Sequence, residues 1–150
     1  MAKQELTLTS KVRIYPKEED KQKIIDTTNA FRNAANYVSK VVFNRKISSS
    51  GAAQDITYDT LREDFRLRAQ MACSVNRSVV AKYASMKSNG VKDTLAVFKK
   101  YEYDLVRARD YSFKANEIIS ISTIYGRIEA PYNAKGVDIH LNDKKIKVPA

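Results

Sequence analysis

The stretch "DYSFKANEIISISTIYGRIEAPY", residues 110–132, is the most strand-like part of this 150-residue chain. Apolar and polar residues alternate from Ile118 to Thr123, which is the two-residue period of a strand with one buried face. The dipeptide Tyr125-Gly126 then predicts a turn, and a second strand is expected over residues 127–132. The stretch therefore predicts a β-hairpin in the last third of the chain.

The same patterns predict the secondary structure of the rest of the chain. Further strands are expected over residues 6–14, 103–109, 112–114, 137–141 and 145–148. Apolar residues recur every three or four positions in three long segments, which predicts helices over 17–45, over 58–69 with Thr57 as N-cap, and over 74–89 with Ser74 as N-cap. A short fourth helix is expected over 91–100, and "ISSSGAAQD", residues 47–55, is expected to be a loop.

One predicted strand precedes the helices and the others follow them. A lone strand does not form a stable sheet, so we expect the first strand to pair with the later ones. The sequence therefore predicts an α+β fold in which a helical lobe, residues 17–100, is inserted into a small β-barrel built from residues 1–16 and 101–150.

The charge of the chain is strongly basic and unevenly distributed. The net charge is +10, the isoelectric point is about 9.7, and the excess of basic residues is +5, +4 and +1 in successive thirds. Such a balance favours a polyanionic partner. The sequence has no apolar run long enough to span a membrane and no apolar segment typical of a secretory signal near its start, so we expect a cytoplasmic protein with no membrane partner.

Side chains for catalysis or metal binding are sparse. Cys73 and His140 are the only residues of their types, which excludes an internal disulfide and a cysteine-based zinc site. Asp104, Asp110 and Asp138 lie near predicted strands, but strand ends and turns account for them. We therefore expect no catalytic residue, no bound metal and no cofactor in this chain.

Three stretches together resemble the N-terminal half of the transposon-encoded TnpB proteins and related miniature type V CRISPR effectors. The first is "KVRIYPKEEDKQKI", residues 11–24, and the second is "FRNAANYVSKVVFNRK", residues 31–46, followed by "ITYDTLREDF". The third is the hairpin stretch quoted at the start, which looks like the "YSF…ISISTxxGRIxxPY" hairpin of the wedge domain in that family. The resemblance covers nearly the whole chain, and its third motif is the most specific.

The resemblance implies a wedge-type β-barrel split by a helical recognition lobe, in a protein that binds a guide RNA and double-stranded target DNA. Cleavage in that family belongs to a following RuvC-like nuclease domain, so catalysis is expected from a separate nuclease chain or not at all. The basic and aromatic residues of the wedge-like strands are the expected RNA-binding set: Lys11, Arg13, Tyr15, Arg107, Arg109, Tyr111, Lys114 and Arg127.

The resemblance also places contacts to the target-adjacent DNA motif at two helix starts. Helix N-termini attract phosphates, and asparagine and arginine pair with adenine and guanine edges. The expected DNA-binding set is Tyr58, Arg62, Ser74, Asn76, Arg77 and Ser78.

Two other functions stay open at this point. The chain could be a stand-alone DNA-binding regulator that kept the helical lobe and lost the RNA. It could also be a protein-interaction fragment whose apolar surface is covered by a partner or by self-association. The salt dependence of RNA and duplex-DNA binding separates the module of a guide-RNA complex from the stand-alone regulator. The size of the protein in solution tests the protein-interaction fragment.

Overall fold

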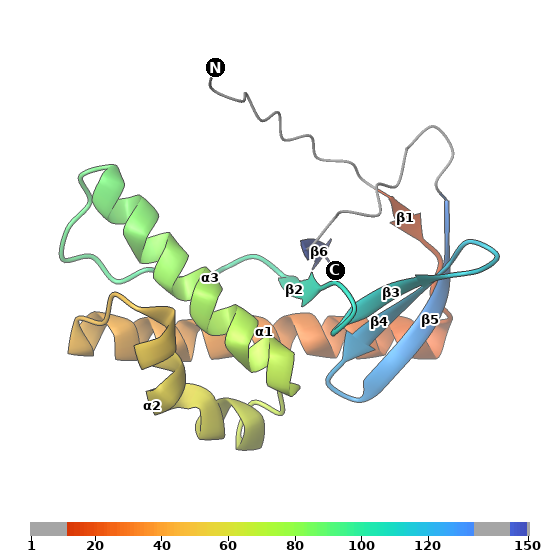
Figure 1. Cartoon of the computed structure of the whole chain (residues 1–150), viewed down its shortest axis with the longest axis horizontal. Coiled ribbons are helices and arrows are strands. Elements are labelled where there is room, and N and C mark those ends of the chain that lie inside the picture. The colour runs from red at the N-terminus through yellow and green to blue at the C-terminus, as the bar shows by residue number, and fades with distance from the viewer. Residues whose placement is uncertain (1–11, 134–144, 150) are drawn as a thin grey trace.

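Three helices and two small antiparallel sheets make up the described part of the chain, residues 12–133 and 145–149 of a computed structural model (Figure 1). The elements are β1 (Arg13–Ile14), α1 (Glu18–Arg45), α2 (Ser50–Glu63), α3 (Ala69–Ser88), β2 (Glu102–Val106), β3 (Tyr111–Lys114), β4 (Ile118–Thr123), β5 (Gly126–Asn133) and β6 (Lys145–Pro149). The fold class is therefore α+β, as the sequence predicts.

The larger sheet is built around the predicted hairpin. Its strand order is β1-β5-β4-β3, and all paired strands are antiparallel. Ile121 lies opposite Tyr111 on one side and Ile128 on the other, and all three side chains are buried. Gly126 has a φ of 118°, a conformation that glycine adopts without strain, and it turns β4 into β5. The hairpin prediction is confirmed, with β4 at its predicted bounds.

The first strand closes onto the far end of this sheet. Arg13 pairs with Asn133 and Ile14 pairs with Tyr132, although the three helices separate the two strands in sequence. This confirms the prediction that the first strand joins the later strands. The earlier part of that predicted strand, residues 6–11, and the predicted strand 137–141 lie outside the described residues.

The smaller sheet consists of β2 and β6, with Leu105 opposite Ile146. Within residues 12–133 and 145–149 it shares no strand with the larger sheet, so the expected barrel is not closed there. The predicted strand 103–109 ends early, at Val106, because the side chain of Asp110 accepts a hydrogen bond from the Val106 N–H over 3.0 Å. This contact turns the chain from β2 into β3.

Helix α1 agrees with its predicted range to within one residue. It begins two residues after Pro16, carries Glu18 and Asp20 in its first turn, and ends at Arg45, where the cap residue Lys46 has a left-handed φ of 53°. One face of the helix is buried, as the spacing of the apolar residues predicts.

The predicted start of the second helix is wrong. Helix α2 begins at Ser50, and Ser49 caps it by accepting a hydrogen bond from the Ala52 N–H over 3.3 Å. Thr57, the expected cap, lies inside the helix and is fully buried. Ala53 is also fully buried, so packing against the core holds the first turns in a helix despite their loop-like composition.

Two further helix predictions are corrected. Helix α3 begins at Ala69 rather than Ser74, with Arg68 at the N-cap position, so Ser74 lies within the helix and does not cap it. Residues 91–100 form no helix. Their main chain is instead bound to side chains of α1 and α3, as at Ala96, whose carbonyl accepts a hydrogen bond from Ser39 over 2.6 Å.

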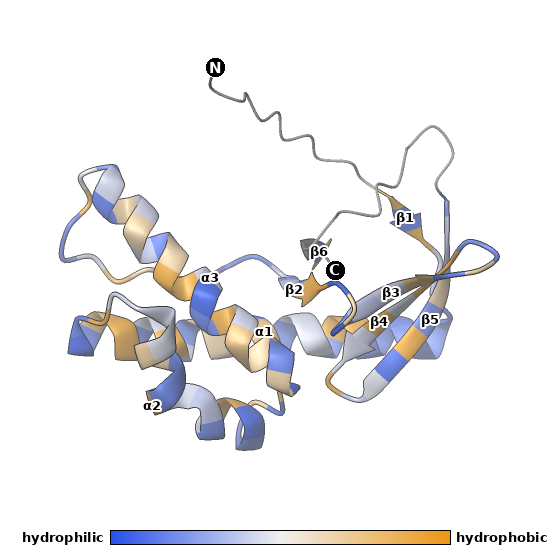
Figure 2. Cartoon of the chain, viewed as in Figure 1, coloured by the Kyte–Doolittle hydropathy of each residue, from blue (hydrophilic) through white to orange (hydrophobic). Residues whose placement is uncertain are grey.

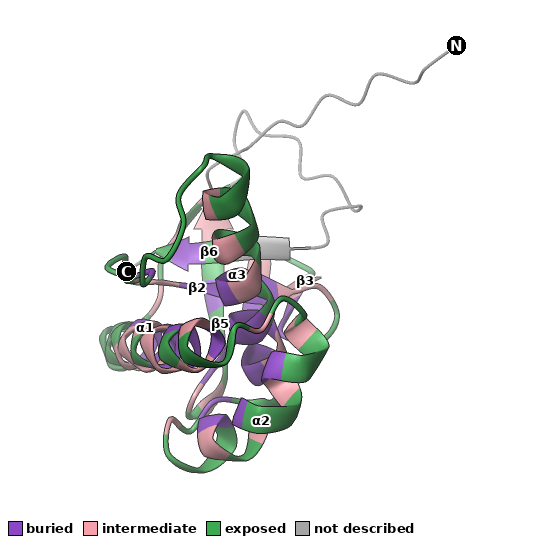
Figure 3. Ribbon diagram, turned by 90° about the vertical axis from the view of Figure 1, so that its left-hand side faces the viewer, coloured by how far each residue is buried: buried purple, intermediate pink, exposed green. Residues whose placement is uncertain are grey.

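A single hydrophobic core joins the helices to both sheets. Helix α1 runs along the molecule, with α2 and α3 packed at one end and the larger sheet at the other (Figure 1). The apolar positions lie on the packed faces of the helices (Figure 2), and the C-terminal end of α3 with the loop after it is exposed (Figure 3). Thr27 of α1 accepts a hydrogen bond from the Ile124 N–H over 3.0 Å, which fixes the β4–β5 turn on α1.

Candidate nucleic-acid interface

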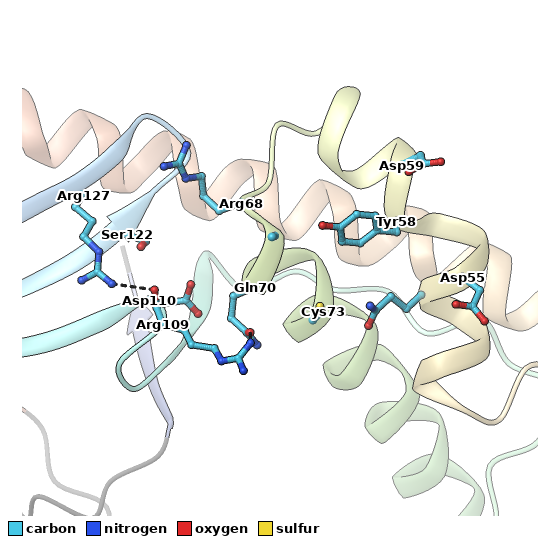
Figure 4. Close-up of a pocket in the computed structure, with 12 residues that line it drawn as sticks. Asp55, Tyr58, Asp59, Arg68, Gln70, Cys73, Arg109, Asp110, Ser122 and Arg127 are labelled. Carbon is cyan, nitrogen blue, oxygen red and sulfur yellow. Dashed lines mark hydrogen bonds between the residues drawn. The ribbon is translucent and has the colours of Figure 1, made fainter.

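A groove of about 790 Å³ lies where the helical lobe meets the larger sheet (Figure 4). Helix α2 and the start of α3 form one wall, while the β2–β3 loop and strands β4 and β5 form the other. The lining residues are Gln54, Asp55, Tyr58, Asp59, Arg68, Ala69, Gln70, Cys73, Arg109, Asp110, Ser122 and Arg127. Three of them are arginines that come from three different elements of the fold.

Two of these arginines are held in place by neutral oxygen atoms. Arg127 donates to the Ser120 hydroxyl over 3.1 Å and to the Arg109 carbonyl over 2.8 Å, so the two residues lie together on the sheet side of the groove (Figure 4). The Arg109 side chain in turn donates to Gln70 of α3 over 3.2 Å. This chain of contacts links the sheet to the helical lobe across the groove.

Within the part of the chain that the structure describes, no direct ion pair neutralises the positive charge of these arginines. Among the described residues, no carboxylate lies within ion-pair distance of Arg68, Arg109 or Arg127. All three side chains are exposed. The groove therefore presents pre-positioned guanidinium groups with donors left over for an anion.

Asp110 lies beneath the two sheet-side arginines and is almost fully buried. Burial raises the pKa of its carboxyl group, against the lowering effects of the Val106 N–H and of the charges on Arg127 and Arg109. Its backbone carbonyl accepts a hydrogen bond from the Ser122 N–H over 2.7 Å. Asp110 thus shapes the β2–β3 turn and places one negative charge behind the arginines.

The carboxylates of the groove do not form a metal site. Asp55 and Asp59 are exposed on α2, whereas Asp110 lies in the opposite wall. In the described ranges no group of three or more histidine, cysteine or acidic side chains could hold a metal ion. Tyr58 is half-buried on α2, and it faces Arg109 and Arg127 from the helical wall of the groove (Figure 4).

The structure brings only part of the predicted RNA-binding set into this groove. Arg109 and Arg127 line it. Arg13 lies 5.7 Å from the ring centre of Tyr15, which is 49% exposed, and this pair is placed by β1 rather than by the groove. Lys114 is paired with Glu129 on the sheet.

Three further members of the RNA-binding set differ from one another. Tyr111 is fully buried and packs edge-on against Phe113 at a ring distance of 5.9 Å, so the prediction that it stacks on a base is wrong for this conformation. Arg107 is half-buried beside the β2–β3 turn. Lys11 lies outside the described residues.

The structure likewise brings only part of the predicted DNA-binding set into the groove. Tyr58 lines the groove, and Arg62 donates to the Leu67 carbonyl over 3.0 Å, closing the α2–α3 turn. Ser74 is 4% exposed and Ser78 donates to the buried carboxylate of Asp104 over 2.7 Å. These two serines therefore face the protein interior rather than a helix end.

Asn76 requires the clearest correction. Its side chain is fully buried, donates to the Ala72 carbonyl over 2.8 Å and accepts from Thr57 over 2.9 Å. A base edge cannot reach an amide that is buried and already hydrogen-bonded in this way. Its neighbour Arg77 is exposed, and its predicted DNA contact stays a prediction.

The sequence-based prediction missed Arg68 and Gln70. Arg68 precedes α3, and Gln70 holds Arg109 from the first turn of that helix. The available signal was the cluster of Arg62, Arg66 and Arg68, which cannot all be buried. The position of Arg68 in the groove follows only from the start of α3 at Ala69.

Comparisons with known proteins leave the class of this chain open. No protein-family model matches the sequence, and no curated protein matches it either. Across the described ranges, none of the helices combines the length and apolar character that crossing a membrane requires.

Proposed function

We propose that this chain is a nucleic-acid-binding module of an RNA-guided DNA-targeting complex, with a wedge-type β-unit and an inserted helical recognition lobe. The module holds the guide RNA and contacts target DNA next to its recognition motif. A separate RuvC-like nuclease chain supplies catalysis where cleavage occurs. The observation that carries the proposal is the groove in which Arg68, Arg109 and Arg127 converge without ion-pair partners among the described residues.

The chemistry of this groove suits a phosphate backbone. Guanidinium groups donate two parallel hydrogen bonds to phosphate, and the start of α3 adds backbone N–H groups and the positive end of a helix dipole. Tyr58 offers a half-buried ring on the facing wall, where an unpaired base could stack. The net charge of +10 provides the long-range attraction that brings a polyanion to the site.

The groove also combines residues expected to bind different nucleic acids. Arg109 and Arg127 belong to the expected RNA-binding set, whereas Tyr58 belongs to the expected DNA-binding set. All three line one groove, so we propose that a single nucleic-acid strand crosses from the sheet to the helical lobe and contacts both sets. RNA is the favoured strand because two of the three residues come from the wedge-like sheet.

Salt titrations of binding test this function. Single-stranded RNA and duplex DNA are each titrated with wild-type protein and with Arg109→Ala, Arg127→Ala and Lys82→Ala. Each groove variant should weaken RNA binding and reduce the slope of log K against log salt by about 0.7 for each lost phosphate contact. Lys82 is an exposed cation on α3 outside the groove, so its variant should stay close to wild type.

The outcomes of this experiment are distinct. Loss of RNA binding alone assigns the groove to RNA, and loss of duplex-DNA binding alone would assign it to the target. Affinities and slopes that stay unchanged for both nucleic acids in both groove variants would remove the groove from the binding surface and contradict the proposal. An Arg127→Lys variant separates charge from geometry, because lysine keeps the positive charge but lacks the planar fork whose two nitrogens contact Ser120 and Arg109.

A further inference from the structure

The β4–β5 turn carries an exposed aromatic ring directly beyond one end of the groove. Ser122 and Arg127 line the groove (Figure 4) and lie opposite each other in the β4–β5 ladder. Thr123 lies opposite Gly126 as the last pair of that ladder. Tyr125 belongs to the turn that follows this pair, and it is 56% exposed. The sheet wall of the groove therefore ends in a tyrosine that is open to solvent.

The Tyr125 ring is held in one position. Its hydroxyl donates a hydrogen bond to the Asp26 side chain of α1 over 2.8 Å, and the Tyr125 N–H donates to the Thr123 hydroxyl over 3.2 Å. The Ile124 N–H donates to Thr27 of α1, so the turn rests on that helix. A ring whose orientation is already fixed loses little conformational entropy when a flat ligand stacks on it.

The helical wall of the groove is extended by a second cation, Arg66. Arg66 and Arg68 lie on either side of Leu67 in the loop between α2 and α3, and both arginines are exposed. Leu67 is 1% exposed, and its N–H donates to the Leu61 carbonyl over 3.1 Å. Arg68 lines the groove. The buried leucine therefore anchors two cations, one within the groove and one next to it.

Arg66 lies close to Tyr125. The hydrogen bond to Asp26 raises the pKa of the Tyr125 hydroxyl, and the nearby positive charge of Arg66 lowers it. Within residues 12–133 and 145–149, Arg66 has no ion-pair partner. The residues that extend the two walls of the groove are thus neighbours in space, and the charge of Arg66 is available to an anion.

The backbone at Arg66 favours a different residue type. Its φ is 58°, a left-handed conformation that glycine and asparagine adopt more readily than arginine does. Strained backbone positions that keep a large exposed side chain are found preferentially at functional sites. The arginine at this position is therefore better explained by a ligand than by the fold.

We propose that Arg66 and Tyr125 extend the groove into a base-stacking site for single-stranded RNA. Arg66 contacts the phosphate next to those bound by the groove arginines, and an unpaired base stacks on the Tyr125 ring. The inference rests on the proposed function, because the strand reaches this site through the groove. Duplex DNA offers the ring no unpaired base, so it is not a ligand of the stacking site.

The test compares two short single-stranded oligonucleotides, one of uridine and one abasic, that share the same ribose-phosphate backbone. Tyr125→Leu removes the ring and should weaken binding of the uridine oligonucleotide about five- to tenfold, while binding of the abasic one stays unchanged. Tyr125→Phe keeps the ring and should retain most of the affinity, which separates the ring from its hydrogen bond to Asp26. Tyr101→Leu removes a 52% exposed tyrosine outside the groove and is the matched control.

Arg66→Gly tests the phosphate contact separately. The variant should weaken binding of both oligonucleotides and reduce the slope of log K against log salt by about 0.7. Glycine adopts the left-handed φ without strain, so the variant should unfold at no lower a urea concentration than wild type. Weaker binding in this variant is then not a folding defect. Unchanged affinities and an unchanged slope would remove Arg66 from the site and overturn the inference.

The remaining outcomes separate this inference from the proposed function. If Arg127→Ala weakens RNA binding while Tyr125→Leu binds uridine as tightly as wild type, the stacking site is wrong and the groove keeps its function. An equal loss of both oligonucleotides in Tyr125→Leu would also overturn the inference, because the ring would then act only through the turn. If neither variant changes the binding of either oligonucleotide, the stacking site and the proposed function both fail.

Discussion

Thr57 of α2 donates a hydrogen bond to the Asn76 side chain of α3 over 2.9 Å, and both side chains are fully buried. The Thr57 hydroxyl also lies 2.8 Å from the Ala53 carbonyl, and the Asn76 amide donates to the Ala72 carbonyl over 2.8 Å. This small polar cluster joins two helices inside an otherwise apolar core. It explains why asparagine occupies a buried position in α3.

Asn76→Ala should therefore lower stability rather than alter sequence preference. The substitution leaves the buried Thr57 hydroxyl without its partner on α3, which should cost about 1–3 kcal/mol of unfolding free energy. Urea denaturation of wild type, Asn76→Ala and Arg77→Ala measures this cost. Arg77 is exposed on the neighbouring position, so its variant should change stability by less than about 0.5 kcal/mol. Full stability in Asn76→Ala, combined with an altered DNA motif, would restore the base-reading role.

Asp110→Asn should strengthen nucleic-acid binding. The substitution removes a buried negative charge behind Arg109 and Arg127, while the amide oxygen can still accept from the Val106 N–H. We expect RNA affinity at neutral pH to rise about three- to tenfold. Because burial raises the pKa of Asp110, wild-type affinity should also increase as the pH falls and the carboxyl group takes up a proton.

The Asp110 variant should show a weaker pH response in the same binding titrations. An affinity that falls in Asp110→Asn would indicate that the carboxylate positions the arginines rather than opposing their charge. Far-UV circular dichroism of the variant separates that result from a loss of folding.

Tyr103→Phe should reduce the sensitivity of the fold to alkaline pH. Tyr103 is fully buried and donates to the Ser122 carbonyl over 3.0 Å. Burial, with a smaller contribution from the charge of Asp110, raises the pKa of its hydroxyl well above the ordinary value. The folded state therefore favours the neutral phenol, and this stabilisation is complete below pH about 10 and is lost as the pH rises further.

Denaturation midpoints from neutral to alkaline pH measure this effect. Tyr103→Phe should cost about 1–2 kcal/mol at neutral pH, because the Ser122 carbonyl loses its partner, and should lose less stability than wild type above pH about 10. Tyr101→Phe removes an exposed hydroxyl and is the control. Parallel pH profiles for wild type and Tyr103→Phe would contradict the assignment.

Lys147→Met should destabilise the protein more than Lys114→Met does. Lys147 of β6 lies 2.9 Å from the buried carboxylate of Asp104 and 3.5 Å from Glu102. Lys114 is paired with Glu129, and both of these side chains are half exposed. We expect a cost of about 1–2 kcal/mol for the first variant and less than about 0.5 kcal/mol for the second. Equal costs in thermal unfolding would show that β6 is held by its backbone ladder alone.

Regular local patterns made much of the fold predictable. The alternation from Ile118 to Thr123 and the turn at Gly126 gave the hairpin, and the spacing of apolar residues gave α1. The lone first strand also required a distant partner, which β5 provides. In each case the local preference and the tertiary environment favour the same conformation.

The errors lie where tertiary contacts override local preference. Residues 91–100 have helix-compatible composition, but Asn36, Ser39 and Tyr83 bind their main chain in an extended form. Helix α3 begins five residues before Ser74, so Ser74 and Asn76 lie on its buried face, whereas Arg77 is exposed. The groove arginines could be identified as exposed, but their convergence depends on how α3 meets the sheet.

The pairing of Arg13 with Asn133 also sets an order of events during synthesis. Strand β1 leaves the ribosome first, yet its partner strand is completed only after all three helices have been made. Closing so long a loop is slow, whereas the contacts between α1, α2 and α3 are closer in sequence and form earlier. The arginine groove has one wall in the helical lobe and one in the larger sheet, so it can form only after Arg127 of β5 has been made. Under the proposed function, a nascent chain should therefore show no groove-dependent RNA binding until β5 has been made.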